Sequence, residues 1–124
     1  MEAKAVVVTG SSTGIGASTA EFLIAKGFRV FGGVRRKGDG ARLQSRLGNA
    51  FTPLVMDVTD GEAISAGARD VTRALAGASL AGLVNNAGIA IGGPLSHLPL
   101  DAFRQQFEVN FFGAVAVTQA FLPL

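Results

Sequence analysis

The chain has 124 residues, which is enough for one domain with a modest core. Hydrophobic residues make up 48% of it and the mean hydropathy is +0.40, which indicates a buried, globular interior and argues against disorder. A net charge of only +2 is poor evidence for a nucleic-acid partner, and the absence of cysteine excludes disulfides, thiol catalysis and cysteine-ligated metals.

The hydrophobic pattern predicts strands that alternate with helices. In chain order we expect a strand at 5–9, a helix at 17–26, a strand at 29–34, a helix at 41–47, a strand at 51–56, a helix at 60–75, a strand at 82–84 and a helix at 100–122. Thr59 and Glu62 have the spacing of a capping box at the start of the third helix. Strands separated by helices favour a parallel sheet that is covered on both faces.

Pro53 indicates the order of these strands. Proline cannot donate to a sheet ladder, so the third strand should lie at an edge. We therefore predict an α/β fold, a Rossmann-like doubly wound parallel sheet with the strand order 3-2-1-4. A ligand would lie over the carboxyl ends of strands one and four, where the order reverses.

A glycine-rich turn joins the first strand to the first helix. Gly10, Gly14 and Gly16 remove Cβ atoms where the chain bends, and the helix start adds free N–H donors and a positive dipole end. This layout predicts a pyrophosphate site. The spacing is Gly-x-x-x-Gly-x-Gly and the chain has 17 glycines, so an ordinary strand-to-helix turn stays open as the alternative.

Basic residues follow the second strand. Val34 occupies the place where folds that prefer NAD carry an acidic residue, and Arg35 follows it. A guanidinium binds a 2′-phosphate through charge-assisted hydrogen bonds, so the pattern favours NADP over NAD, with Arg36 as a second candidate. The alternative is a solvated basic cluster that continues through Arg42 and Arg46.

Two short segments follow the later strands. Residues 85–88, with the sequence Asn-Asn-Ala-Gly, would let a flat ligand lie against the backbone while the amide side chains bridge loops, although an ordinary turn fits the same residues. His97 is the only histidine, and we expect an exposed loop residue there, with no metal site.

Taken together, the motifs resemble the short-chain dehydrogenase/reductase family of the classical type. Residues 9–16 are similar to its Thr-Gly-x-x-x-Gly-x-Gly loop, Asp57 and Val58 to its adenine-contact pair, and residues 85–88 to its Asn-Asn-Ala-Gly signature. Asn110 matches the asparagine of its catalytic tetrad. The resemblance covers the whole chain, with the motifs in the family's order.

The resemblance implies roles for individual residues. It implies a cofactor site made of Gly10, Ser12, Thr13, Gly14, Ile15, Gly16, Arg35, Arg36, Asp57, Val58, Asn86, Ala87 and Gly88. Within it, Asp57 would accept a hydrogen bond from the adenine amino group, and Asn85 would brace the sheet. Asn110 would support a proton relay and locally interrupt its helix.

The chain also departs from the family. Members are about twice this length, and they use a serine, a tyrosine and a lysine four residues after it, whereas this chain has no tyrosine. We therefore expect residues 1–124 to be the dinucleotide-binding half of a truncated oxidoreductase that transfers hydride between NADP(H) and a small alcohol or carbonyl substrate. A non-catalytic nucleotide-binding module, or an interaction protein that docks through an open sheet edge, are the alternatives.

Location and partners complete the expectations. No targeting segment precedes the first apolar run, so we expect a cytoplasmic protein. Glycines, asparagines and Pro94 interrupt the uncharged stretch at 74–100, which argues against a membrane span. A homo-oligomer stays open.

Overall fold

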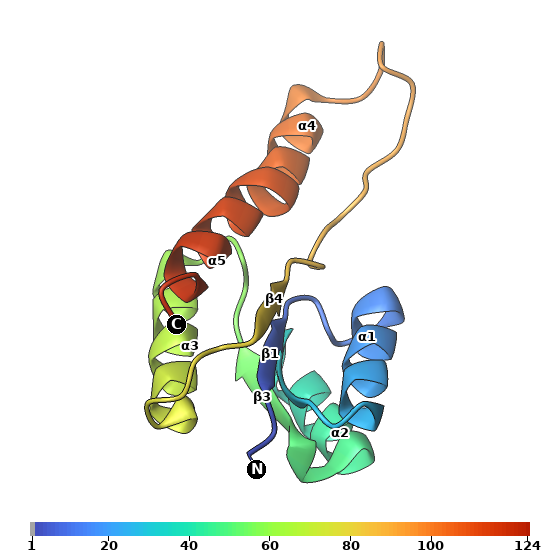
Figure 1. Ribbon diagram of the computed structural model, residues 1–124. Helices are drawn as coiled ribbons and strands as arrows, with labels where there is room; N and C mark the ends of the chain where they lie inside the picture. The colour runs from blue at the N-terminus through green and yellow to red at the C-terminus, as the bar shows by residue number, and fades with distance from the viewer. Residues whose placement is uncertain (1) are drawn as a thin grey trace.

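A computed structural model describes residues 2–124 as a twisted parallel sheet with helices on both faces (Figure 1). The elements are β1 (Ala5–Val8), α1 (Gly14–Ala25), β2 (Arg29–Val34), α2 (Lys37–Leu47), η1 (Gly48–Ala50), β3 (Phe51–Val55), α3 (Gly61–Leu75), β4 (Gly82–Val84), α4 (Leu100–Phe107), η2 (Glu108–Gly113) and α5 (Ala114–Phe121). Helices α1 and α2 cover one face, and α3 and α5 cover the other.

The sheet has four strands in the order β3-β2-β1-β4, and all three pairings are parallel. The predicted fold class and strand order are therefore confirmed. Pro53 pairs with Gly32 on the edge strand β3, where its missing N–H costs no ladder bond. Because the order reverses beside β1, the carboxyl ends of β1 and β4 border the crevice in which a ligand of such a sheet lies.

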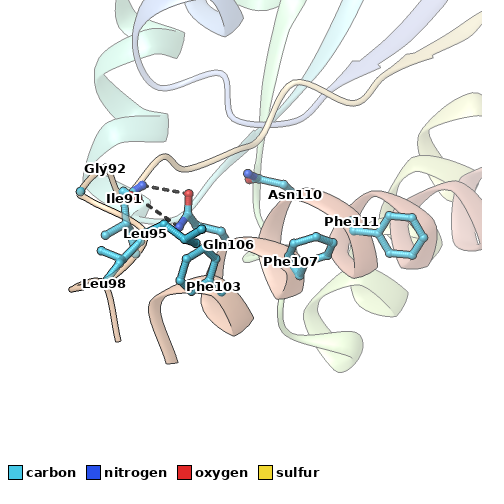
Figure 2. A pocket seen from close by; sticks show the side chains of 10 residues that line it. Ile91, Gly92, Leu95, Leu98, Phe103, Gln106, Phe107, Asn110 and Phe111 are labelled. Atoms are coloured by element: carbon cyan, nitrogen blue, oxygen red, sulfur yellow. Dashed lines mark hydrogen bonds between the residues drawn. The ribbon is translucent and has the colours of Figure 1, made fainter. Parts of the chain in front are cut away.

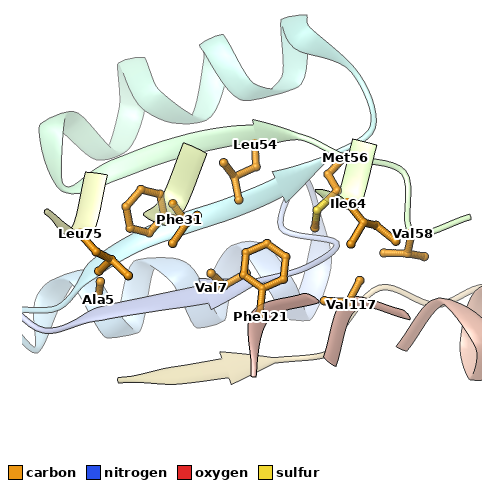
Figure 3. Close-up of a cluster of buried hydrophobic side chains, with 11 residues drawn as sticks. Ala5, Val7, Phe31, Leu54, Met56, Val58, Ile64, Leu75, Val117 and Phe121 are labelled. Carbon is orange, nitrogen blue, oxygen red and sulfur yellow. The ribbon is translucent and has the colours of Figure 1, made fainter. Parts of the chain in front are cut away.

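The core consists of two layers because successive strand residues point to opposite faces. Val7, Phe31 and Leu54 pack against α3 and α5, as Figure 3 shows, with Phe121 closing the layer. On the other face, a second cluster of strand residues packs against α1 and α2; it includes Val6, Val8, Val30 and Phe51. Both faces of β1 are thus buried, which explains its unbroken run of apolar residues.

Helix α2 begins at Lys37, four residues before the predicted start. Gly38 and Gly40, which are poor helix formers, lie in its first turn. A Cβ at Gly40 would lie 2.7 Å from Pro53 Cβ. The glycine therefore lets α2 approach the edge strand closely, and this packing outweighs its low helix propensity. Helix α1 likewise begins earlier than predicted, at Gly14 rather than at residue 17.

The predicted capping box of Thr59 and Glu62 is wrong. Asp60 is the N-cap of α3, and its Oδ1 accepts hydrogen bonds from the N–H groups of Glu62 and Ala63 at 3.0 and 3.2 Å. The Thr59 hydroxyl instead donates to Asp57 Oδ1 at 2.7 Å. The Thr59 hydroxyl is thus engaged by Asp57, and Asp60 caps the helix instead.

The final helix is not continuous. The predicted span of 100–122 is divided into α4, the π-helical segment η2 and α5, and Asn110 lies within η2. Helix α4 and the segment before it project beyond the carboxyl edge of the sheet (Figure 1). None of the helices within residues 2–124 is long and apolar enough to cross a membrane.

Candidate functional site

A hollow of about 350 Å³ lies at the carboxyl ends of the strands. It brings together most of the residues that the sequence analysis assigned to a cofactor, from four separate loops. These are Gly10, Ser12, Thr13, Gly14, Ile15, Arg35, Asp57, Val58, Asn86, Ala87 and Gly88. Gly16 and Arg36 do not line it. Arg36 is exposed at the N-terminal end of α2.

Four lining residues were missed by sequence reasoning, namely Gly33, Met56, Ile89 and Val109, and Val34, which it named but did not assign to the site, lines the hollow as well. Gly33 and Val34 end β2, and Met56 directly follows β3. Their place at the carboxyl ends of parallel strands was a usable signal. Val109 offered none, because its approach to the hollow depends on the packing of η2.

The glycine loop packs directly against the segment after β4. Gly10 has a φ of +61°, and a Cβ there would lie 2.7 Å from Ala87 Cα. A Cβ at Gly16 would collide with the Gly10 carbonyl oxygen and with Asn86 Nδ2. Gly16 does not line the hollow itself. Its missing Cβ allows α1 to approach the glycine loop closely.

The start of α1 is open to an anion. Thr13 is its N-cap residue but makes no side-chain capping hydrogen bond, and the first turn carries no acidic residue. The backbone N–H groups of the first turn of a helix have no intrahelical partners, and the dipole places partial positive charge there. The loop and helix start together form a cradle suited to phosphate.

Thr9 and Asn86 join the loops after β1 and β4. The buried Thr9 hydroxyl accepts from the N–H groups of Asn86 and Ala87 at 3.0 and 2.9 Å. Asn86 Nδ2 donates to the carbonyl oxygens of Thr9 and Gly10 at 3.2 and 2.9 Å. These bonds fix the relative position of the two loops that border the hollow.

Two further polar side chains tie the surroundings of the site together. Ser11 is fully buried, and its hydroxyl donates to the Gly33 carbonyl oxygen at 3.0 Å, which connects the glycine loop to the end of β2. Asn85 Nδ2 donates to Thr118 Oγ1 at 2.9 Å. Asn85 thus braces the end of β4 against α5.

Asp57 carries a stabilised negative charge at the rim of the hollow. The backbone N–H and the hydroxyl of Thr59 donate to its Oδ1 at 2.9 and 2.7 Å. These two hydrogen bonds lower the pKa of Asp57 below its ordinary value, burial opposes them, and the charge of Arg35 adds to the lowering. Asp57 is therefore a carboxylate at neutral pH and an acceptor for an N–H donor.

Arg35 is exposed and lines the same hollow. Among the residues that the structure describes, no carboxylate lies within ion-pair distance of its guanidinium. Its donors are thus available to a ligand anion. Arg42, by contrast, is held by Asp39 at 3.7 Å and donates to the Ser12 carbonyl oxygen at 3.3 Å.

Asn110 reaches the segment after β4 from η2. Its Oδ1 accepts from the Ile89 N–H and its Nδ2 donates to the Ile89 carbonyl oxygen, both at 2.8 Å. Asn110 does not line the first hollow but borders a second one of about 540 Å³ between α4 and residues 91–98 (Figure 2). It therefore stands between the two hollows and contacts the wall that they share.

His97 lines neither hollow. It is exposed, and its Nδ1 lies 2.9 Å from the hydroxyl oxygen of its neighbour Ser96. Within residues 2–124 no group of histidine and carboxylate side chains is arranged to hold a metal ion.

The geometry agrees with comparisons to known proteins. The family model described as short chain dehydrogenase matches residues 4–124. An NADPH-dependent 3-dehydrocapnine reductase from Ornithobacterium rhinotracheale is 43% identical over 118 residues, which are 95% of this chain and 42% of that protein. The chain thus spans less than half the length of this relative.

Solved structures show the same relation. A short-chain dehydrogenase from Streptomyces avermitilis superposes with a TM-score of 0.88 at 36% identity, over 99% of this chain and 44% of that one. An NADPH-bound carbonyl reductase from chicken fatty liver also gives a TM-score of 0.88, at 28% identity, over 99% of this chain and 52% of that one.

The packing of Gly10 against Ala87 predicts a difference between two glycine substitutions. Both Gly10 and Gly14 have positive φ angles, +61° and +57°, but a Cβ at Gly14 would meet nothing within 4 Å. We expect Gly14→Ala to cost about 1–2 kcal/mol of unfolding free energy from backbone strain alone. Gly10→Ala should cost about 1–3 kcal/mol more, because the loop must also move away from Ala87. Urea unfolding measures both, and equal losses would contradict the packing argument.

The hydrogen bonds of Thr59 predict how Asp57 titrates. Thr59→Val removes the hydroxyl donor and keeps the N–H, so the pKa of Asp57 should rise part of the way toward its ordinary value of 3.8. A lowered folded-state pKa stabilises the fold above the unfolded-state pKa and is lost as the pH falls through the folded-state pKa. The stability difference between wild type and Thr59→Val should therefore shrink below about pH 4.

Carboxyl carbon NMR titration and urea unfolding across this pH range measure the two effects. Thr72→Val is the matched control, because the Thr72 hydroxyl donates to the Ala68 carbonyl oxygen on the exposed side of α3 and makes no hydrogen bond to a carboxylate. A pKa of Asp57 that is the same in wild type and Thr59→Val would refute the assignment.

Proposed function

This chain belongs to the short-chain dehydrogenase family, and we propose that it forms the cofactor-binding half of an NADP-dependent oxidoreductase. The reaction would transfer hydride between the cofactor and an alcohol or carbonyl substrate. One observation carries the proposal: the free guanidinium of Arg35 and the uncapped start of α1 face one hollow at the switch point of the sheet. Two anionic groups of one ligand can bind there together.

The residues present fit a dinucleotide. The collisions that a Cβ would make at Gly10 and Gly16 mean that the loop reaches its position only with glycines there. We assign the pyrophosphate to residues 10–16, the adenine amino group to Asp57 and its neighbour Val58, and the ribose side to residues 86–88. When bound, the nicotinamide of this cofactor supplies the hydride.

Arg35 supports NADP rather than NAD as the cofactor. Val34 stands where an acidic residue would bind the ribose diol of NAD, so nothing at that position repels a 2′-phosphate. Arg35 offers several donors in a planar fork that matches phosphate geometry. The NADPH-dependent reductase among the relatives and the NADPH-bound carbonyl reductase among the solved structures support the same choice.

Proton transfer needs residues that this chain does not contain. It has no tyrosine, and the family's reaction uses one as general acid and base. Asn110 acts here as a positioning residue, because both polar atoms of its side chain are engaged by the Ile89 main chain. We infer that residues 1–124 bind the cofactor and that the remaining reacting groups come from the length that the relatives have in addition.

A second candidate function is an interaction module. β4 pairs only with β1, so its other edge carries backbone groups without a strand partner within residues 2–124. Such an edge can accept a strand from another polypeptide. Co-purification with a second chain that restores turnover would favour this candidate, and NADPH binding without any partner would favour a nucleotide-binding module.

The role of Arg35 predicts a change in cofactor preference. Arg35→Ala removes charge-assisted hydrogen bonds to the 2′-phosphate, so the affinity for NADP should fall by about tenfold or more while that for NAD stays nearly constant. Arg36→Ala is the matched control, because Arg36 does not line the hollow. Isothermal titration calorimetry of wild type and both variants with each cofactor measures the six affinities. Equal losses for Arg35→Ala and Arg36→Ala would contradict the assignment.

The missing tyrosine predicts binding without turnover. We expect the purified chain to bind NADPH but to oxidise none of it in the presence of aldehydes and ketones, because the chain lacks the tyrosine that the family uses to protonate the carbonyl oxygen. Cofactor fluorescence reports binding, and absorbance at the nicotinamide band reports turnover. NADPH oxidation that follows the chain through further purification would overturn this proposal.

A further inference from the structure

Thr9 and Ser11 are the two buried polar side chains within residues 2–124, and they flank Gly10 in the loop after β1. The Thr9 hydroxyl accepts from two backbone N–H groups of the segment after β4. Ser11 is bonded to the neighbour on the opposite side. Its N–H and its hydroxyl both donate to the Gly33 carbonyl oxygen at the end of β2, at 2.9 and 3.0 Å. The glycine loop is therefore held on both sides, toward β4 by Thr9 and toward β2 by Ser11.

The hydroxyl of Ser11 adds a hydrogen bond that the sheet does not require. The Gly33 carbonyl oxygen already accepts from the Ser11 N–H, as it would from a neighbouring parallel strand. Burial of a hydroxyl costs free energy unless the hydroxyl is paired, so a serine at this position is compensated only by this second bond. Gly32 leaves the room for it, because a Cβ on Gly32 would lie 2.6 Å from Ser11 Oγ. Residues of two segments thus combine to place one hydroxyl.

The hydrogen bond of Ser11 connects two parts of the candidate cofactor site. Residues 12–15 follow Ser11 directly and line the hollow, as does Arg35 just after the end of β2. Ser11 itself does not line the hollow. On its other side the end of β2 is tied to the segment after β3, because the Met56 N–H donates to the Val34 carbonyl oxygen at 2.8 Å. Ser11 is thus a side-chain tether between the phosphate cradle and the strand end that carries Arg35.

Two anion sites bind one ligand together only when their separation matches that of its charged groups. The 2′-phosphate and the 5′-phosphate of the adenosine part of NADP are attached to the same ribose, so their separation can change little. Once one phosphate is bound, the effective concentration of the other at its site depends on how closely the protein keeps this separation. A glycine loop that drifts relative to β2 would lower this advantage and leave the binding of a single phosphate unchanged.

We propose that Ser11 is a positioning residue for cofactor selection: its buried hydroxyl fixes the separation of the phosphate cradle and Arg35, so that a nucleotide with both a 5′- and a 2′-phosphate is bound at both phosphates at once. The inference rests on the proposed function, which assigns residues 10–16 and Arg35 to these two phosphates. Ser11 acts through the Gly33 carbonyl group and does not itself line the hollow. The preference for NADP thus depends on a residue outside the binding surface as well as on the charge of Arg35.

The test compares two probes that differ by one phosphate, 5′-AMP and adenosine 2′,5′-bisphosphate. Ser11→Ala removes the hydroxyl and keeps the N–H, so the Gly33 carbonyl oxygen keeps one partner and the variant should fold. Ser18→Ala is the matched control, because Ser18 is exposed on α1 and does not line the hollow. Val71 is a fully buried core residue of α3, so Val71→Ala lowers the stability of the fold without changing any residue of the loop.

Isothermal titration calorimetry measures the affinities, and we expect wild type to bind the bisphosphate more tightly than 5′-AMP. In Ser11→Ala this preference should shrink about fivefold, the effect of one neutral hydrogen bond, while the affinity for 5′-AMP stays within about twofold. The amide hydrogen of residue 11 should exchange about fivefold faster, because its bond to Gly33 has lost the companion that held the loop. Ser18→Ala and Val71→Ala should keep the wild-type preference.

A double-mutant cycle separates positioning from a general effect on the loop. In an Arg35→Ala background, Ser11→Ala should change the affinity for the bisphosphate by about twofold at most, because no second phosphate contact remains to be aligned. A fivefold loss in this background as well would show that Ser11 does not act through the separation from Arg35.

Other results would also overturn the inference. Equal losses of affinity for 5′-AMP and the bisphosphate in Ser11→Ala would mean that the whole loop is weakened, with no role in selection. A lost preference in Val71→Ala would mean that the preference follows the stability of the fold, and an unchanged exchange rate at residue 11 would mean that the hydroxyl does not hold the loop. In all these cases the proposed function stands. If wild type binds neither nucleotide, the proposed function is wrong and the inference fails with it.

Discussion

The site depends on one contact, the packing of the glycine loop after β1 against the segment after β4. The two segments meet so closely at Gly10 and Ala87 that no Cβ fits between them, and the Thr9 hydroxyl and the Asn86 amide bind them together with four hydrogen bonds. All of these groups sit at the switch point of the strand order, where helices leave the two strands toward opposite faces. The crevice exists because this contact holds its two sides at a fixed separation.

The electrostatic design of the site follows from this framework. The start of α1 lacks a capping side chain, so its N–H groups stay available to an anion. At the start of α3, by contrast, the Asp60 side chain accepts hydrogen bonds from the first-turn N–H groups. The other end of the hollow is lined by one negatively and one positively charged side chain. Thr59 holds Asp57 as a carboxylate that accepts N–H donors, and Arg35 faces the same space as a free cation. A ligand that carries phosphates and an amino-substituted base satisfies all three features.

On the far side of the hollow, side-chain amides make the hydrogen bonds that a neighbouring strand would otherwise make. The segment that follows residues 86–88 has no strand partner within residues 2–124, and the amides of Asn110 and Gln106 supply the missing hydrogen bonds. The π-helical turns of η2 place Asn110 where its side chain reaches Ile89, and Gly88 leaves room for it, since a Cβ there would lie 3.2 Å from Asn110 Oδ1. The π-helical segment η2 and the extended segment after β4 thus stabilise each other next to the crevice.

The sequence by itself determined the strands, their order and most of the residues that line the hollow at their carboxyl ends. Unbroken apolar runs separated by helices allow only a parallel sheet covered on both faces, and Pro53 is tolerated only at its edge. Tertiary structure decided what depends on distant neighbours: the missing Cβ of Gly40 lets α2 pack closely against Pro53, and the missing Cβ of Gly16 lets α1 approach the Asn86 amide. The cap of α3 was decided locally, because the Thr59 hydroxyl donates to Asp57 and Asp60 becomes the N-cap. Local sequence patterns report backbone preferences and periodicity. They do not contain the contacts between residues far apart in the chain, and those contacts decide how closely two elements pack.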